Sequence, residues 1–147
     1  MGIRSWEPRD VSAIAGLLRQ LQADMGEAQT VTAESVGAQF ARMGDAEVYE
    51  TFVHEVDGRV AGFVSLVFYR SPLHRRGTAL VNELVVEAGF RDRGLGAELL
   101  RYSVARAKAR GMDEIEVGVE AGNSRASAFY KRNGITEEYI LLGLRFD

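Results

Sequence analysis

The sequence contains no cysteine, and this absence excludes several kinds of chemistry. Disulfide frameworks, thiolate metal sites and cysteine nucleophiles all require that residue. Histidine is almost as scarce, because His54 and His74 are the only two. A zinc site built on them would also need carboxylates, and none stands at a recognisable metal-binding spacing. We therefore expect no bound metal.

Long apolar runs and an excess of basic residues are also missing. No segment approaches the ~20 apolar residues of a membrane-spanning helix, and the first residues do not resemble a signal peptide. We expect a soluble, cytoplasmic protein without a membrane partner. The chain has 18 basic and 21 acidic side chains, a formal net charge of −3. Because nucleic-acid-binding domains usually carry a basic surface, we do not expect a nucleic-acid partner.

What the sequence does have is the composition of a globular domain. Its 147 residues are 46% apolar and 27% charged, which is typical of a chain that folds around a proper core. No repeat, low-complexity tract or linker interrupts it, so we predict one domain over residues 1–147. Periodicity predicts strands at 3–6, 49–56, 59–69, 78–86, 114–119 and 135–146, and helices at 10–21, 32–43, 95–110 and 124–132.

The helix predicted at 95–110 joins two strands, 78–86 and 114–119. A full helical crossover of this kind places its two strands parallel to each other. The hairpin predicted around Asp57-Gly58 is antiparallel. We therefore predict an α/β fold with a mixed sheet.

A glycine-rich turn, Arg91–Ala97, lies between the strand at 78–86 and the helix that follows it. Such a turn gathers unpaired backbone N–H groups at the positive end of a helix dipole, where phosphate oxygens bind. Gly94 and Gly96 could also serve only to allow a tight turn beside solvated arginines. The dinucleotide fingerprint fails because Leu99 occupies its third glycine position, and neither Lys-Ser nor Lys-Thr follows as in a P-loop.

Two motifs in this sequence resemble those of the GNAT superfamily of N-acetyltransferases. The first is R/Q-x-x-G-x-G/A, matched by Arg91, Gly94 and Gly96. The second is N-x-x-A-x-x-(L/F)-Y-x-x-x-G-F, and its matching residues run from Asn123 to Gly134, with Ile135 in place of the usual phenylalanine. Together with the order of elements between them, the motifs cover more than a third of the chain.

The resemblance implies a central mixed sheet with splayed parallel strands, flanked by about four helices, and acetyl-CoA as co-substrate. In this family the loop amides wrap the pyrophosphate, and the pantetheine arm bonds to the splayed strand like an additional strand. The residues that the resemblance assigns to the pyrophosphate are Arg91, Asp92, Arg93, Gly94, Leu95, Gly96 and Ala97. Those assigned to the pantetheine arm are the backbone groups of Leu84, Val85 and Val86, together with Asn123 and Ala126.

The motif tyrosine, Tyr130, is implied to be the general acid on the leaving thiolate. A phenol with an ordinary pKa near 10 is protonated at neutral pH and can donate a proton. Packing beside Phe129 is the simpler alternative role for this side chain. The amide of Val85 or Val86 is the expected donor to the oxyanion, as the resemblance implies.

The general base is assigned to Glu83, although some relatives carry their carboxylate at the position of Asn82. Because side chains alternate along a strand, Glu83 should point away from the face that Asn82 occupies, unless a bulge redirects it. Glu120 is a second candidate, and a positioned water without a dedicated base is a third. Both glutamates could instead be ordinary ion-pair partners.

The leading hypothesis is direct transfer of the acetyl group to a primary amine, since an acetyl-cysteine intermediate is impossible without cysteine. The alternative is a non-catalytic acyl-CoA-binding sensor or regulatory module. The resemblance implies that the acceptor sits near residues 21–43 and the loop 71–77, where Asp24, Glu27 and Glu34 could attract a cation. A small-molecule amine and a protein amine both stay open, as does a homodimer.

Overall fold

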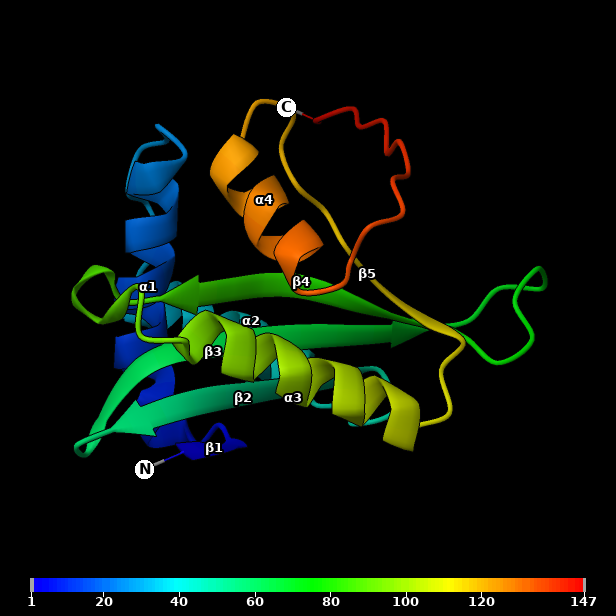
Figure 1. Ribbon diagram of the computed structural model, residues 1–147. Helices are drawn as coiled ribbons and strands as arrows, with labels where there is room; N and C mark the ends of the chain where they lie inside the picture. The colour runs from blue at the N-terminus through cyan, green and yellow to red at the C-terminus, as the bar shows by residue number, and fades with distance from the viewer. Residues whose placement is uncertain (1, 147) are drawn as a thin grey trace.

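The computed structural model describes residues 2–146, in which a five-stranded sheet lies between two pairs of helices (Figure 1). The strands follow chain order across the sheet: β1 (Gly2–Ser5), β2 (Tyr49–Val56), β3 (Arg59–Tyr69), β4 (Thr78–Val86) and β5 (Glu114–Val117). Only the β4–β5 pair is parallel, and the three other pairs are antiparallel. The predicted α/β fold with a mixed sheet is confirmed.

Helices cover both faces of this sheet. On one face lie α1 (Val11–Asp24) and α2 (Ala33–Arg42), and on the other lie α3 (Leu95–Ala109) and α4 (Ser124–Arg132). Short 3-10 helices, η1 (Pro8–Asp10) and η2 (Ala88–Phe90), precede α1 and follow β4. Each of the helices within residues 2–146 is too short or too polar to cross a lipid bilayer.

Local sequence signals explain where several elements begin. Thr32 and Ser35 form a reciprocal capping box at the start of α2, each side chain accepting from the other's backbone N–H at 3.0 Å. Asp57 and Gly58 both have positive φ angles (50° and 77°), which the tight turn between β2 and β3 requires. Asn123 caps α4 by accepting from the Ala126 N–H at 3.1 Å.

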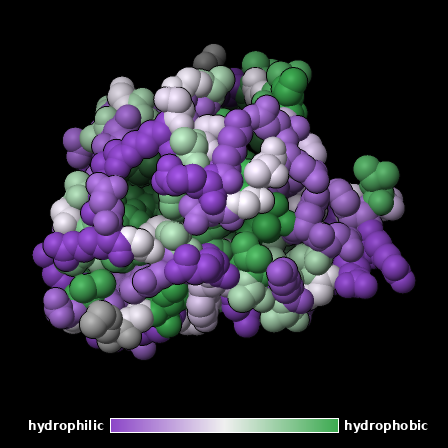
Figure 2. All heavy atoms as spheres, viewed as in Figure 1, coloured by the Kyte–Doolittle hydropathy of each residue, from purple (hydrophilic) through white to green (hydrophobic). Residues whose placement is uncertain are grey.

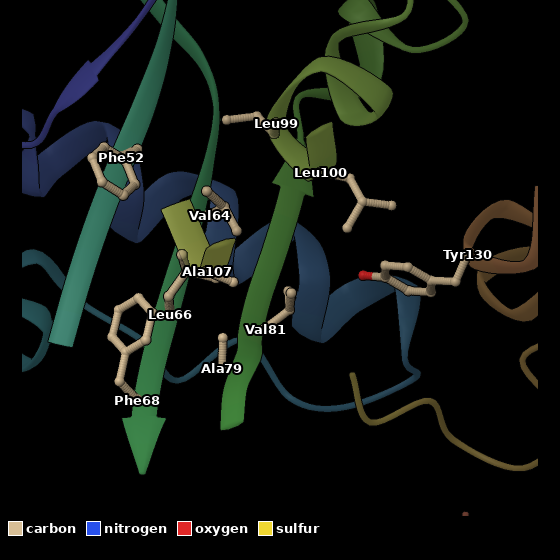
Figure 3. Packing of buried hydrophobic residues seen from close by; sticks show 10 residues of the cluster. All are labelled: Phe52, Val64, Leu66, Phe68, Ala79, Val81, Leu99, Leu100, Ala107 and Tyr130. Carbon is tan, nitrogen blue, oxygen red and sulfur yellow. The ribbon is translucent and has the colours of Figure 1, made fainter. Parts of the chain in front are cut away.

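The two faces of the sheet have separate cores. One core joins α1 and α2 to the sheet and includes Ile14, Val53, Phe63 and Val85. The other lies under α3 and includes Val64, Val81, Leu99, Leu100 and Tyr130 (Figure 3). Strands β3 and β4 contribute side chains to both cores, so a residue's position along β4 decides which face it serves.

The strand predicted at 135–146 is wrong. Ile135 packs against the α3-side core, but residues 136–146 form no regular secondary structure. Their large apolar side chains are exposed, among them Ile140, Leu142, Leu144 and Phe146 at 82–91%, and apolar atoms appear at the upper edge of the surface in Figure 2. The alternating pattern is that of a strand, but no strand within residues 2–146 pairs with this segment. Ladder hydrogen bonds, which stabilise a strand, are therefore not formed.

The parallel pair β4–β5 separates halfway along β4. Its last paired residues are Val81 and Val117, where β5 ends two residues earlier than the sequence predicted. Beyond that point β4 continues to Val86 with no strand on its β5 side, and β4 diverges from the segment that follows β5 (Figure 1). The splayed strands expected from the resemblance are confirmed.

Candidate active site

A bulge in β4 determines where Glu83 points. Ser65 of β3 pairs with Glu83, and the next residue, Leu66, pairs with Val81, so Asn82 is an additional residue on β4. Val81 belongs to the core under α3, whereas Glu83 lines a cleft on the α1–α2 face. Two residues apart on a regular strand, these side chains would share one face. The bulge therefore turns Glu83 toward α1 and α2 and leaves Asn82 exposed at the strand edge.

Glu83 is held in place by Ser65. The Ser65 hydroxyl donates to the Glu83 carboxylate, and the Glu83 N–H donates to Ser65 Oγ at 3.2 Å. Burial raises the pKa of Glu83 above its usual value, and the hydrogen bond from Ser65 opposes part of that rise. A carboxylate whose pKa is raised by desolvation is a stronger base than an exposed glutamate.

The cleft that contains Glu83 has a volume of about 250 Å³. Its floor is formed by the sheet residues Phe63, Ser65 and Glu83, and two exposed polar residues of α2, Ser35 and Gln39, stand at its rim. Apolar side chains from α1, the α1–α2 loop and α2 form the walls: Ile14, Leu18, Val31, Val36, Phe40 and Met43.

Of the region expected beside the acceptor, part of residues 21–43 lines this cleft, but the acidic residues and the loop at 71–77 do not. None of Asp24, Glu27 and Glu34 lines the cleft, and Asp24 instead forms an ion pair with Arg91 at 2.5 Å. The loop at 71–77 precedes β4, so it lies at the opposite end of the strand from the glycine-rich turn (Figure 1). Glu120 is exposed in the turn after β5 and does not line the cleft either.

The free edge of β4 presents backbone groups of Leu84 and Val86. The Glu87 N–H donates to Ala61 O on β3 at 2.8 Å, and the Val85 carbonyl oxygen would lie 2.9 Å from a Cβ on Gly62 of the same strand. Because backbone groups alternate in direction along a strand, those of Leu84 and the N–H of Val86 face the open side, whereas the Val86 carbonyl accepts from Gln20. Val85 faces β3 and buries its side chain in the α1–α2 core.

The turn after η2 ends in free amides at the start of α3. Gly94 occupies the N-cap with φ 82°, and its carbonyl accepts the first helical bond, from Glu98 N–H at 3.0 Å. The N–H groups of Leu95, Gly96 and Ala97 therefore have no partner within the helix. At a helix N-terminus such amides fit phosphate oxygens.

The side chains around this turn are closely arranged. A Cβ on Gly96 would lie 3.2 Å from Phe129 Cζ, so the glycine allows α4 to pack against the first turn of α3. The Arg93 guanidinium lies 5.2 Å from the centre of the Phe90 ring. Arg91 and Arg93 are thus both engaged with protein groups in this structure.

Tyr130 approaches β4 from the face opposite Glu83. Figure 3 shows its hydroxyl directed from α4 toward the space between Leu100 and Val81. The side chain is only 9% exposed, and burial alone raises its pKa to about 12. The phenol is therefore protonated at neutral pH. Its ring also packs edge-on against Phe129, so the packing role and the predicted catalytic role coexist.

Two contributors to the site could not be identified from sequence motifs. Ser65 is a polar residue in the apolar run from Val60 to Phe68, which was the available signal. Gln20 of α1 bridges the end of β4, donating to Val86 O at 2.8 Å and accepting from Ala88 N–H at 2.9 Å. Nothing in its local sequence separates Gln20 from other polar residues on α1.

A mixed sheet with splayed parallel strands and a helix N-terminus after the splayed strand defines the fold of acyl-CoA-dependent N-acetyltransferases. Residues 16–135 match the Acetyltransferase (GNAT) family, and the chain belongs to this family.

Similar proteins of known sequence include two from distant organisms. An uncharacterized N-acetyltransferase of Methanocaldococcus jannaschii, MJ1207, is 37% identical over 93 residues, which are 63% of this chain and 41% of that protein. The chain thus spans less than half the length of this relative. Glucosamine 6-phosphate N-acetyltransferase 1 of Oryza sativa subsp. japonica is 29% identical over 149 residues, 98% of this chain and 86% of the relative.

The fold is also found in a solved structure with coenzyme A. The aminoglycoside N-acetyltransferase AAC(6')-Iy in complex with CoA aligns with a TM-score of 0.81 at 18% identity, covering 98% of this chain and 93% of the other. At that identity the similarity is one of fold.

Proposed function

We propose that this protein transfers the acetyl group of acetyl-CoA to a primary amine by direct attack. The observation that carries the proposal is the bulge at Asn82, which aims Glu83 into an apolar cleft. Family membership supports acetyl-CoA as the donor. The free amides of Leu95, Gly96 and Ala97 and the open edge of β4 supply groups that fit its pyrophosphate and its pantetheine arm.

The binding residues divide into two sets. Around the pyrophosphate stand the turn residues Arg91 to Gly94 and the first turn of α3. Along the pantetheine arm stand the backbone groups of Leu84, with Asn123 and Ala126 at the start of α4, and the Val86 N–H faces the thioester. Val85 does not belong to this second set, because its backbone faces β3.

The reaction requires two protons to leave the acceptor ammonium. Glu83 accepts the first, which makes the amine nucleophilic. As the new N–C bond forms and the C–S bond breaks, Tyr130 supplies a proton to the sulfur and recovers one from the amide nitrogen. The Val86 N–H on the open edge is the donor that stabilises the oxyanion. Acetyl-CoA supplies the activated acyl group, and the chain's own residues move the protons.

Thiol release from acetyl-CoA in the presence of a panel of amines tests this function. We expect amine-dependent release, and we expect Glu83→Gln to lower kcat/KM by about 10²–10⁴-fold, the range for loss of a general base. Glu120→Gln, an exposed glutamate outside the cleft, is the matched control and should retain activity.

Two other results would contradict the proposal in different ways. Stabilisation by acetyl-CoA without release on any amine would favour the non-catalytic acyl-CoA-binding module. Absence of any thermal stabilisation at millimolar acetyl-CoA would exclude the donor itself, because a ligand that binds only the folded state raises its stability.

A further inference from the structure

The chemical character of the cleft above Glu83 indicates what kind of amine enters it. Six of its wall residues are apolar, and its floor adds the ring of Phe63. Glu83 is the single charged residue among those that line it, and no lysine, arginine or histidine does so. An acceptor with a phosphate or carboxylate would therefore bury its negative charge without a cationic partner, beside a carboxylate.

The polar groups of the cleft are concentrated at its two ends. Glu83 and Ser65 lie on the sheet, where the Ser65 hydroxyl donates to one carboxylate oxygen of Glu83 and the Glu83 N–H donates to Ser65 Oγ. Ser35 and Gln39 stand at the exposed rim. Between these ends the walls offer no side-chain donor or acceptor for the hydroxyl groups of a sugar, so such an acceptor would lose hydrogen bonds with water.

The volume of the cleft limits the size of the acceptor. Since a water molecule takes about 30 Å³ in the liquid, a cleft of about 250 Å³ can bury roughly eight non-hydrogen atoms of an acceptor. An acceptor with an amine at one end and an apolar chain or ring at the other would place the amine beside Glu83 and the apolar part between the apolar walls.

We propose that the acceptor is a small primary amine on an uncharged apolar body, such as an alkylamine or arylalkylamine, with its ammonium beside Glu83. This inference rests on the proposed function for the acetyl transfer itself, and on the residues of the cleft for the choice of acceptor. It separates the chain from its rice relative, whose name specifies a phosphorylated amino sugar.

Binding can be measured independently of acetyl transfer. Trp6 is the only tryptophan in the sequence, and its ring stacks on that of Phe40, a wall residue of the cleft, with 4.2 Å between centroids. Tryptophan fluorescence therefore reports occupancy of the cleft without acetyl-CoA. A loss of both binding and turnover can then be distinguished from a loss of turnover alone.

The decisive experiment is a series of straight-chain amines from propylamine to nonylamine. Burial of each added methylene should raise affinity and kcat/KM by about fourfold, the equivalent of ~0.8 kcal/mol. We expect this rise to stop when the cleft is full, near heptylamine, and we expect 2-phenylethylamine to be a substrate. A flat series, or higher kcat/KM with glucosamine 6-phosphate or a lysine-containing peptide than with heptylamine, would overturn the inference.

A pair of methionine variants tests the same point within the protein. Met43 lines the cleft after α2, and Met25 occupies the equivalent C-cap position after α1 outside it. Met43→Lys should lower affinity for heptylamine at least tenfold while leaving the KM of acetyl-CoA unchanged. Met25→Lys should change neither quantity, and equal effects of the two variants would contradict the assignment.

Failure of the two proposals gives different results. If alkylamines bind with the stepwise rise in affinity but no thiol is released, the cleft specificity stands and the transferase function falls. If polar amines are acetylated in preference to alkylamines, the transferase function stands and the apolar acceptor is wrong.

Discussion

Ser65 and Glu83 are joined by two reciprocal hydrogen bonds across β3 and β4. The serine hydroxyl donates to the carboxylate, and the glutamate N–H donates to the same oxygen at 3.2 Å. They are also the last paired residues before the bulge interrupts the register. This contact thus holds the proposed base in position and opposes the rise in its pKa that burial causes.

Ser65→Ala should move the acid limb of the pH–rate profile to higher pH. The hydrogen bond from Ser65 opposes the rise that burial causes in the pKa of Glu83, so its loss allows the pKa to rise further. Measured as kcat/KM, which reports groups of the free enzyme, activity should fall below wild type first at acid pH. Ser103→Ala removes another buried serine, on α3, and should leave the profile unchanged.

Glu83→Gln should stabilise the folded protein at neutral and alkaline pH. Burial raises the pKa of Glu83, so the folded state holds a proton that the unfolded state has released, and stability falls as pH rises from the unfolded pKa through the folded one. Glutamine does not ionise and avoids this loss. In thermal unfolding, the Tm of the variant minus the Tm of wild type should be larger at pH 8 than at pH 4. A constant difference across that range would contradict the assigned direction.

Tyr130→Phe should lower kcat while the KM of acetyl-CoA stays near that of wild type. The variant keeps the ring that packs against Phe129 and removes only the hydroxyl proposed to protonate the sulfur. General acids contribute about 10²–10⁴-fold to rate, so a fall in that range is expected. Tyr102→Phe is the control, since Tyr102 packs edge-on against Phe52 away from the site. Full activity in Tyr130→Phe would contradict the catalytic role and would mean that the Tyr130 side chain serves only in packing.

The pattern of elements could be predicted from the sequence because caps and periodicity are local. The range predicted for α4 is the observed one, Ser124–Arg132, because Asn123 and Gly134 mark its ends. The direction of Glu83 could not be predicted, because it depends on how β4 registers with β3. The strand prediction for residues 136–146 failed for a related reason. An alternating pattern determines which side chains share one face of a strand, but a strand also needs a neighbouring strand to pair with.

The glycine-rich turn also combines a feature that is visible in the sequence with one that is not. The motif singles out Gly94 and Gly96, but the structural reason why each must be glycine is visible only in three dimensions. Gly94 adopts a positive φ at the N-cap, whereas Gly96 lies against Phe129, a residue more than thirty positions away in the sequence. Contacts of this range leave no local trace in the sequence.

Gly96→Ala should weaken acetyl-CoA binding without affecting the amine cleft. The new methyl group would lie 3.2 Å from Phe129, so α4 must move away from the first turn of α3, at a typical overpacking penalty of about 1–3 kcal/mol. The KM of acetyl-CoA should rise, while alkylamine binding measured by Trp6 fluorescence should not change. In Gly37→Ala, where the nearest atom is 4.0 Å away, the helix should instead become more stable.

Asp24→Asn should strengthen acetyl-CoA binding by releasing Arg91. In this structure the Arg91 guanidinium pairs with Asp24 at 2.5 Å, at the end of α1 and beside the proposed pyrophosphate site. Partly exposed ion pairs contribute up to about 1 kcal/mol, so we expect the KM of acetyl-CoA to fall by no more than about fivefold, and less at high salt because screening weakens the gain. Glu7→Gln breaks a comparable surface pair with Arg9 far from the turn and should have no effect. An increase in KM for Asp24→Asn would contradict this expectation. It would mean that Asp24, at the end of α1, holds the Arg91 guanidinium in the position from which it binds the pyrophosphate.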